Sequence, residues 1–392
     1  MKASVAIVGG GLHGLSLAFN LARRGLKEIV VLDANYWQGG ASGRNGTLVR
    51  GGFSSPEWSR FFGYSLELWL DLSRTLGHNV MFTRRGYVIL AESERTAAVC
   101  DSARAIHRQV GVQSSAIEGE DVRRLLPLVD HRRVKGGIHF DAGGTAPHHA
   151  AMKGYLAACR ERGVTVRYGS EVTGIECGNG RVSAVVVGDE RIDAEAVVIA
   201  AGSLSPKVAE LAGVVLEGKP FRLEACALEP LRPVIGPALA MLDRTVYLHQ
   251  TGRGEIVGGC EVPGEHAGLS LASDLPVMAA YARHLVEMMP ALGSLRILRQ
   301  WAGHVHATAD WGPLLGRHPD LRDLWISAGW LYGVAGAPAS GDLLAKAIVT
   351  GEVDARMAPF AVDRQRQGRS VKEQAIGAFT IRPESLSGGC HS

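Results

Sequence analysis

The first residues that suggest a chemistry are three glycines near the start of the chain. Gly9, Gly11 and Gly14 follow the apolar run 5–8, and apolar residues at helical spacing come directly after them. In such a strand–turn–helix unit the first glycine permits a tight turn, the second lets a pyrophosphate approach the backbone, and the third lets helix and strand pack closely. The helix N-terminus then offers unpaired N–H groups to the phosphates. This pattern predicts a dinucleotide site.

An acidic side chain stands where a dinucleotide site needs one. The apolar run 29–32 predicts a second strand, and this strand ends in Asp33. A carboxylate at this distance from the glycines can hold the ribose hydroxyls of an adenosine. The glycines alone would be weak evidence, since other α/β proteins have glycine-rich turns. Here a strand, a helix, a second strand and a terminal acid occur together.

Two arginines, Arg44 and Arg50, lie in a glycine-rich loop at 36–53. The guanidinium group presents a planar set of donors that suits a phosphate or a carboxylate. Each arginine could therefore bind a charged group of a ligand. On composition alone, surface arginines on a flexible loop are an equally good interpretation.

Four histidines raise the question of further chemistry. His148 and His149 precede a helix predicted at 150–162, where a histidine is often only a cap or a surface residue. His304 and His306 fall on one face of a predicted strand, because side chains alternate along it. A metal pair is imaginable, but no third ligand stands at a recognisable spacing, so we expect no metal site.

A second glycine-rich stretch lies near the other end of the chain. It includes Gly333 and Gly336, and it leads into a helix predicted at 342–350. The partial positive charge at a helix N-terminus stabilises nearby negative charge. We expect this turn to stabilise the negatively charged end of a reduced flavin.

Composition limits the classes of function. The chain has 392 residues, a hydrophobic content of 46% and a net charge of +3, from 42 basic and 39 acidic residues. This near balance argues against a nucleic-acid-binding tract, so a small-molecule ligand is expected. The six cysteines are far apart without a C-x-x-C pair, which suits a reducing compartment. Without a charged leader or a long apolar run, we expect a soluble, cytoplasmic protein.

Strands and helices alternate between the two glycine-rich stretches. The segment 57–77 predicts a long amphipathic helix whose aromatic residues belong to the core rather than to a cofactor site. A strand and two helices within 86–126 predict a separate lobe, and a three-strand meander is predicted within 171–199. Alternating strands within 219–262 predict an antiparallel sheet that could cover a flavin.

Taken together, the sequence resembles the FAD-dependent D-amino acid oxidase superfamily over nearly its whole length. The resemblance rests on six segments in the right order: GGGLHGLSLAFNLA, GRNGTLVR, SLELWLDLSRTLGHNVMFTRRG, GGTAPHHA, RQWAGHVHATADWGPLLG and AGWLYGVAGAPASG. Within the superfamily, the sequence is similar to the β subunits of heterotetrameric sarcosine oxidases and of related opine, proline and hydroxyproline dehydrogenases.

The resemblance implies an α/β fold with a Rossmann-like FAD-binding domain and a discontinuous α+β substrate domain built on an antiparallel sheet. The FAD-binding domain would comprise residues 1–85, 141–218 and 300–360. The substrate domain would comprise residues 86–140 and 219–299, and residues 361–392 would form a C-terminal tail in which we predict no chemistry.

The resemblance also implies which residues contact the FAD. The cofactor-binding residues would be Gly9, Gly11, Gly14, Asp33, Ser42, Gly43, Arg44, Asn45, Val172, Gly202, Gly333, Gly336 and Pro338. Similar β subunits attach a second flavin, FMN, covalently at the position of His148, on the face shared with a large α subunit. We therefore expect a hetero-oligomer with a large α subunit and small subunits, with FMN at His148 or at the interface, and His149 as the less favoured site.

Arg50 falls where related sarcosine oxidases use an arginine to hold the substrate carboxylate. Those relatives carry a second cation, a lysine, in a GGFKATPGSG-like turn. Here the turn reads GVAGAPASG, with Ala335 or Gly336 in place of the lysine. Loss of one cation would weaken the binding of a small acid such as sarcosine, so a different and larger secondary amino acid is expected, such as an opine or a proline or hydroxyproline derivative.

The resulting hypothesis is oxidation of the C–N bond of a secondary or N-alkyl amino acid to an imine, by hydride transfer to a flavin. Besides Arg50, the candidate catalytic residues are polar groups that could line the pocket or assist proton loss: Tyr247, His249, His304 and Tyr332. Two alternatives stay open. The protein could be a single-polypeptide oxidase of D-amino acids or glycine with one FAD, or a flavin-binding subunit without a catalytic site of its own.

Overall fold

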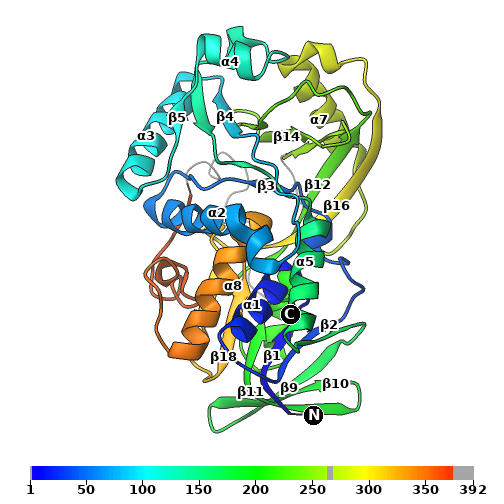
Figure 1. Ribbon diagram of the computed structural model, residues 1–392, viewed down its shortest axis with the longest axis vertical. Coiled ribbons are helices and arrows are strands. Elements are labelled where there is room, and N and C mark those ends of the chain that lie inside the picture. Colours follow the sequence, from blue (N-terminus) through cyan, green and yellow to red (C-terminus); the bar gives the residue numbers. More distant parts are fainter. Residues whose placement is uncertain (1, 263–267, 374–392) are drawn as a thin grey trace, which may run out of the picture.

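The computed structural model describes residues 2–262 and 268–373, which are organised around two eight-stranded sheets. In Figure 1 the first sheet lies in the lower half of the molecule and the second in the upper half. A two-stranded sheet of β3 (Leu48–Val49) and β7 (Gly144–Thr145) completes the described strands. Among the described residues, no helix is both long and apolar enough to cross a bilayer.

The first sheet is the predicted nucleotide-binding sheet. Its strand order is β17-β18-β11-β1-β2-β8, with β10 and β9 continuing from β11. The strands are β1 (Lys2–Val8), β2 (Ile29–Asp33), β8 (Thr165–Tyr168), β9 (Val172–Gly178), β10 (Arg181–Val187), β11 (Glu190–Ile199), β17 (Leu314–Arg317) and β18 (Leu324–Ala328). The pairs β1–β2, β1–β11, β2–β8 and β11–β18 are parallel. The predicted meander is confirmed, because β9, β10 and β11 pair in antiparallel fashion.

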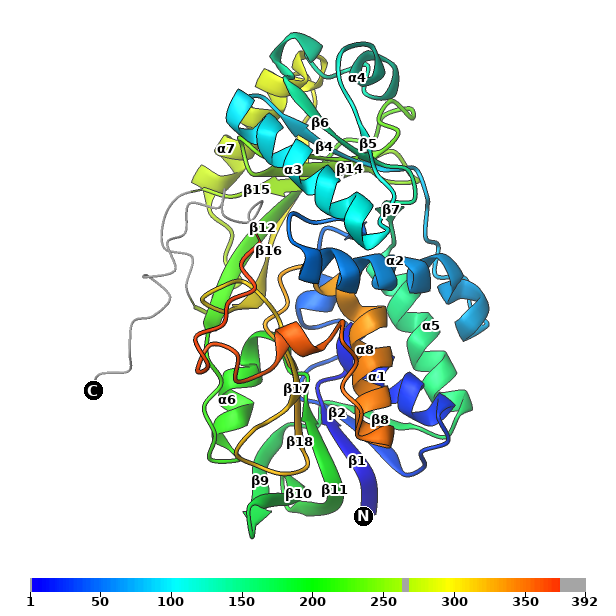
Figure 2. The same cartoon turned by 90° about the vertical axis from the view of Figure 1, so that its left-hand side faces the viewer.

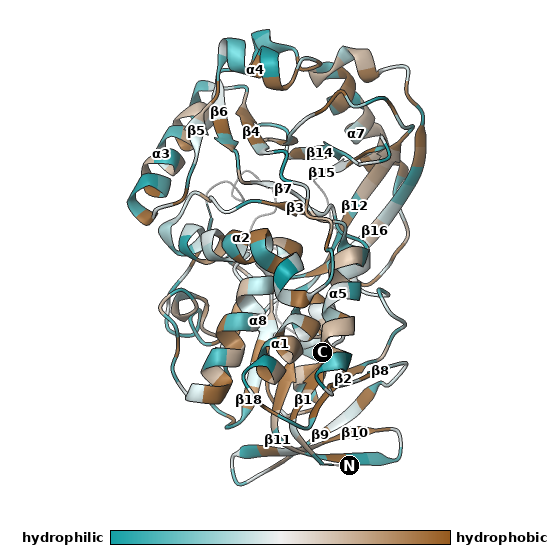
Figure 3. Cartoon of the chain, viewed as in Figure 1, coloured by the Kyte–Doolittle hydropathy of each residue, from teal (hydrophilic) through white to brown (hydrophobic). Residues whose placement is uncertain are grey.

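Three helices pack together on this sheet. They are α1 (Leu12–Arg23), α5 (His148–Glu161) and α8 (Gly333–Thr350), and Figure 2 shows them side by side. The central strands have apolar side chains on both faces, as a parallel sheet requires, since Val5, Ala6, Ile7 and Val8 are all buried. Figure 3 shows the apolar residues concentrated in the strands of both sheets, and hydrophilic residues on outer elements such as α4 (Gly119–Leu125).

The second sheet has the order β16-β12-β15-β14-β13-β4-β6-β5. Its strands are β4 (Tyr87–Ala91), β5 (Ser115–Ala116), β6 (Gly136–Phe140), β12 (Lys219–Leu228), β13 (Ala238–Met241), β14 (Val246–Gln250), β15 (Ile256–Cys260) and β16 (Ile297–Ala307). The strand pairs within 219–262 are antiparallel, as predicted. β4, which was predicted to belong to a separate lobe, instead joins this sheet, parallel to β13 and antiparallel to β6. β16 lies largely within the predicted FAD-binding segment 300–360. It nevertheless pairs with β12, a strand of the predicted substrate domain. The exact domain boundaries stay a prediction.

The remaining helices are α2 (Pro56–Leu76), α3 (Glu94–Val110), α6 (Ser205–Glu210) and α7 (Leu275–Met288). They include one, α2, that lies within a residue of the predicted segment 57–77, and one short helix, α6, that the sequence analysis did not predict. The N-terminus of α2 is capped by the Ser55 hydroxyl, which accepts a hydrogen bond from the Trp58 N–H, and Gly77 in a left-handed conformation ends the helix. The aromatic residues of α2, among them Phe61 and Phe62, are buried in the core, as predicted.

The start of α8 corrects the predicted boundary. The sequence predicts a glycine-rich turn before a helix at 342–350, but the helix begins at Gly333 and includes Pro338. Pro338 has no N–H group, so it cannot donate the helix hydrogen bond to the carbonyl of Val334, four residues earlier. The indole N–H of Trp69 donates to that carbonyl instead, over 3.2 Å. A packing contact from α2 therefore permits a helix that the local sequence disfavours.

The described part of the C-terminal tail folds back onto the body of the protein, in orange-red in Figure 2. Arg364 is fully buried and forms a bidentate ion pair with Asp310, at 2.9 Å from Nε and 2.6 Å from Nη2. Asp310 also accepts the Val371 N–H over 3.0 Å, and the Trp58 indole donates to the Val371 carbonyl. Residues 374–392 of the predicted tail lie outside the described residues.

Arg364→Met should destabilise the fold, because it leaves the buried Asp310 carboxylate without its cation. Breaking a buried pair in this way costs about 3–5 kcal/mol. The free energy of unfolding, measured by urea titration, checks this expectation. The control is Arg366→Met, whose partner Asp320 is exposed, and it should change stability little. Equal stability of the two variants would show that the tail is not held by this pair.

Candidate active site

One large cavity lies between the two sheets. Its volume is about 710 Å³, and its lining includes the β1–α1 turn, the loop after β2, the start of α8, and residues of β12, β14 and β16. Pockets of this size are typical of small-molecule and cofactor sites. The nucleotide-binding motif and the antiparallel sheet thus contribute to one cavity, as the sequence analysis expects.

The glycine turn forms one end of this cavity. Gly9 has a φ of +118°, and a side chain there would come within 2.3 Å of the Ala200 carbonyl oxygen. A side chain on Gly14 would lie 1.9 Å from the Gly9 oxygen, so this glycine permits the helix to pack on the strand. Gly9 and Gly11 line the cavity, whereas Gly14 supports the turn from behind.

Asp33, at the end of β2, is fixed at the cavity wall by the backbone. Its Oδ2 accepts the Gly10 N–H over 2.7 Å, and its Oδ1 accepts the Asn35 N–H over 2.8 Å. A carboxylate oxygen has more than one lone pair, so both oxygens can still accept hydroxyl groups of a ligand. This is the geometry that ribose recognition requires.

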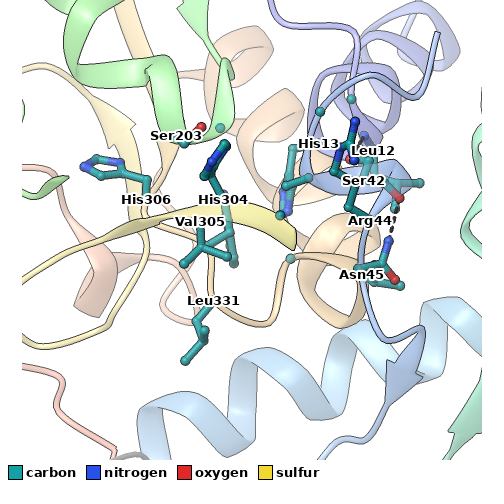
Figure 4. A pocket seen from close by; sticks show the side chains of 18 of the residues that line it. Leu12, His13, Ser42, Arg44, Asn45, Ser203, His304, Val305, His306 and Leu331 are labelled. Atoms are coloured by element: carbon teal, nitrogen blue, oxygen red, sulfur yellow. Dashed lines mark hydrogen bonds between the residues drawn. The ribbon is translucent and has the colours of Figure 1, made fainter. Parts of the chain in front are cut away.

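The loop after β2 meets the N-terminus of α1, as Figure 4 shows. The Ser42 hydroxyl accepts the Leu12 N–H over 3.0 Å, and the Asn45 amide donates to the Ser42 carbonyl. Ser42, Arg44 and Asn45 line the cavity, but Gly43 does not. A side chain on Gly43 would lie 2.1 Å from the Gln38 oxygen, so this glycine serves the loop conformation.

These residues fit an FAD. Glycines leave the backbone accessible at the phosphate position, the N-terminus of α1 supplies N–H groups, and Asp33 supplies the ribose acceptor. Val172, Gly202 and Gly333 line the same cavity, and their contact with FAD stays a prediction. Gly336 and Pro338 do not line it, because they lie further along α8 than the lining residues 333–335, and Gly336 packs against Trp330 and Phe62.

Arg50 lines the cavity and is buried, since only 6% of the residue's surface is exposed. Its guanidinium carbon lies 4.2 Å from the ring centroid of Phe53, and 5.5 Å from those of Tyr87 and Tyr332. Burial by itself would lower the pKa of Arg50, but Tyr87, Tyr332 and Glu373 together raise it. Arg50 therefore stays charged beside the cavity, where it can bind a carboxylate.

Two of the predicted catalytic residues, Tyr247 and Tyr332, line the cavity. Tyr332 lies beside Arg50, and Tyr247 lies against the loop after β2. Burial raises the pKa of both hydroxyl groups, so they are protonated at neutral pH and can donate hydrogen bonds. The aromatic ring of Tyr247 lies against Gly46, where a side chain would come within 2.6 Å of the ring.

The predicted histidines divide between the cavity and the core. His304 and His306 both line the cavity, but Nε2 of His304 donates to the Ser270 carbonyl over 2.8 Å. His306 donates to Glu217 and accepts the Gly329 N–H, so both ring nitrogens are used. Burial lowers the pKa of His306 to about 4. Within residues 2–262 and 268–373, no cluster of metal-ligand residues is found.

His249 does not line the cavity. It is buried behind the wall, and its Nε2 lies 3.1 Å from the Thr47 hydroxyl. Burial lowers its pKa to about 4, so the ring is neutral at physiological pH. The position favours support of the loop after β2 over direct contact with a substrate.

His148 lies apart from the cavity, at the first position of α5. It is half-buried. Burial, and to a smaller extent the neighbouring His149, lowers the pKa of His148 to about 4. Its Nδ1 atom is buried and has no hydrogen-bond partner among the described residues. His149 is exposed. The attachment of a flavin at His148 stays a prediction.

Acidic residues at or near the cavity, among them Glu373 and Glu261, escaped the sequence analysis. Glu373, from the tail, accepts hydrogen bonds from the N–H and the hydroxyl of Ser54, and it acts electrostatically on Arg50. Glu261, which follows β15, lines the cavity. No motif marks either residue, because each reaches the site only through the folding of distant segments.

Comparisons with known proteins agree with this geometry. A family model described as FAD dependent oxidoreductase matches residues 4–347. The sequence is 32% identical to the sarcosine oxidase subunit beta of Rhizobium meliloti (strain 1021), over 95% of this chain and 91% of that protein. The crystal structure of L-proline dehydrogenase from P. horikoshii has a TM-score of 0.90 at 26% identity, over 94% of this chain and 99% of that chain. Glycine oxidase from Geobacillus kaustophilus shares the fold, with a TM-score of 0.81 at 20% identity, over 93% and 99%.

Asp33→Ala should weaken FAD binding, since it removes the ribose acceptor and frees the Gly10 N–H. Loss of a hydrogen bond to a charged group corresponds to an affinity decrease of about tenfold to a hundredfold. Reconstitution of the apoprotein with FAD, followed by flavin fluorescence, gives the dissociation constant. The control is Asp189→Ala, in the exposed turn between β10 and β11. Unchanged affinity in the Asp33 variant would remove this residue from the site.

Proposed function

Because the chain belongs to the family of FAD-dependent oxidoreductases, we propose that it oxidises the C–N bond of a secondary or N-alkyl amino acid to an imine. The observation that carries this proposal is Arg50, a charged and buried guanidinium group in the wall of the cavity, since such a group suits a carboxylate. The bound FAD would accept the hydride equivalent of the oxidation. The names of two similar proteins, sarcosine oxidase subunit beta and L-proline dehydrogenase, support this substrate class.

The protein's own residues bind and orient the substrate. Arg50 would hold the carboxylate, and the aromatic rings around it keep water away from this ion pair. The protonated hydroxyls of Tyr247 and Tyr332 would donate hydrogen bonds to the substrate and fix its orientation. Hydrolysis of the imine by water would complete the reaction.

The cavity favours a substrate other than sarcosine. Of the two residues that could stand in place of the lysine, Ala335 lines the cavity and is 3% exposed, and Gly336 does not line it. Among the described lining residues, the other cations are Arg44, in the loop after β2, and the exposed Lys207. A clamp with one buried cation suits a larger secondary amino acid that gains affinity from further contacts, such as an opine, proline or a hydroxyproline derivative.

We further propose that the protein works in a hetero-oligomer with a large α subunit, with FMN bound at His148. The relative from Rhizobium meliloti is named as a subunit, which supports an assembly of this kind. A cytoplasmic location is also proposed, and the free cysteines of the described segments, Cys100, Cys159, Cys177, Cys226 and Cys260, support a reducing compartment. A sixth cysteine, Cys390, lies outside the described residues.

Arg50→Met should raise KM for the carboxylate substrate by about tenfold to a hundredfold, because the charged hydrogen bonds to the substrate are lost. The substrate is first chosen as the compound that reduces the bound flavin fastest under anaerobic conditions, from a panel of sarcosine, L-proline, 4-hydroxyproline and an opine.

The matched control is Arg84→Met, an exposed arginine that pairs with exposed Asp141. It should leave KM unchanged. If no member of the panel reduces the flavin, the proposed substrate class is wrong. If KM is also unchanged in the Arg50 variant, the arginine is not the carboxylate-binding residue.

His148→Ala should abolish covalent flavin if FMN is attached there. The complex is purified with its natural partner subunits and precipitated with acid, and the flavin that stays with the precipitated protein is measured. The control, His149→Ala, should retain it. Covalent flavin in the His148 variant would refute the attachment site, and a lone polypeptide with one releasable FAD would favour an oxidase without partner subunits.

A further inference from the structure

Besides Arg50, two buried acidic residues, Glu224 and Glu261, line the cavity. Glu261 directly follows β15 and is 8% exposed, and it contributes to the cavity wall. Both of its carboxylate oxygens are buried without a hydrogen-bond partner among the described residues. Burying an ionised carboxylate without a partner costs several kcal/mol, so such a group takes up a proton unless a cation pairs with it. A group of this kind requires an explanation, and a ligand that pairs with it in the cavity provides one.

Glu224, on neighbouring β12, shows what a structural carboxylate looks like in the same wall. It also lines the cavity, but its oxygens accept the Asp274 N–H over 3.0 Å and the Gln300 amide over 2.7 Å. Arg222 lies 3.6 Å from it. These protein groups satisfy Glu224, whereas nothing in the described wall satisfies Glu261.

We propose that Glu261 is the acceptor for the substrate's amino group. An amino acid enters as a zwitterion. Arg50 would pair with its carboxylate, and the bound ammonium group would favour the ionised form of Glu261 and pair with it. Glu261 would then take one N–H proton, so that R₂NH₂⁺ and a carboxylate become R₂NH and a carboxylic acid. The amine gains the free electron pair that formation of an imine requires. This inference rests on the proposed function and specifies how the same site recognises its substrate.

The surroundings of Glu261 support such a proton acceptor. Burial raises its pKa to about 8. Other titratable groups surround Cys260, the residue that precedes Glu261. They are Cys226 and Glu224 on β12, Tyr247 on β14 and Arg283 on α7, and each interacts electrostatically with Cys260. None of them is a cause of the raised pKa of Glu261. The carboxyl group is therefore uncharged well below pH 8 in the free protein and charged above it.

Two probes of equal shape separate the charge of the amine from the rest of the ligand. Glycine betaine and 3,3-dimethylbutyrate share a carboxylate and a trimethyl head, but the head of betaine is a cation and that of dimethylbutyrate is neutral. Betaine has no free electron pair on nitrogen, so it cannot form an imine and does not reduce the flavin. Binding to the FAD-loaded protein is measured by equilibrium dialysis at pH 6.5 and pH 9.

The wild-type protein should bind betaine about tenfold or more tightly than dimethylbutyrate at pH 9, since an ion pair with Glu261 forms there. The preference should shrink at pH 6.5, where the free carboxyl group is protonated. Glu261→Gln should remove both the preference and its pH dependence. Glu120→Gln, an exposed residue of α4, should retain both.

The outcomes distinguish this inference from the proposed function. A wild-type preference that the Glu261→Gln variant retains, or a wild type without preference at pH 9, overturns the role of Glu261. Arg50→Met, with Glu261 intact, should weaken the binding of both probes equally. If it does not, the proposed carboxylate site at Arg50 is wrong, and the role of Glu261 is not affected. Flavin content and near-UV circular dichroism of each variant establish that it is folded, and Glu261→Asp provides a charge-retaining variant that should keep part of the preference.

Discussion

The close approach of backbone segments around the glycine turn is the constraint on which the rest of the structure depends. Gly9 lies against the Ala200 carbonyl at the end of β11, and Gly14 lies over the carbonyl of Gly9. On the other side of α1, Gly341 of α8 lies against Ser16, where a side chain would come within 2.2 Å. Because these contacts leave no room for a Cβ atom, α1 is held between the sheet and α8. Its N-terminus then faces the cavity, where phosphate groups would bind.

Burial of charge is the second organising principle of the site. Arg50 lies among aromatic rings, and the tail supplies Glu373 as a nearby negative charge. The tail is itself fixed by the buried pair of Arg364 and Asp310. A charge that leaves water needs a partner of opposite sign. Glu373 lies near Arg50, whereas both carboxyl oxygens of Glu261 lack a hydrogen-bond partner among the described residues. The proposed ligand would supply that partner through its amino group.

Local patterns in the sequence predicted most of the fold. The apolar runs indicated β1, β2 and β11, and the alternating segments indicated the second sheet, because strands and their two faces are encoded at a period of two residues. The start of α8 was predicted wrongly, since glycines and a proline normally oppose a helix. There the donor that replaces a missing hydrogen bond comes from Trp69, far away in the sequence.

For the site, the sequence by itself determined two kinds of residue. One kind contributes through its backbone, and the other contributes a side chain at the end of a strand. The glycine turn is of the first kind and Asp33 of the second, because the turn and the strand that place them are local. Only the tertiary structure decided that His249 lies behind the wall and that Glu261 and Glu373 belong to the site. Burial and charge pairing depend on which distant segments come together, and neither composition nor spacing records that.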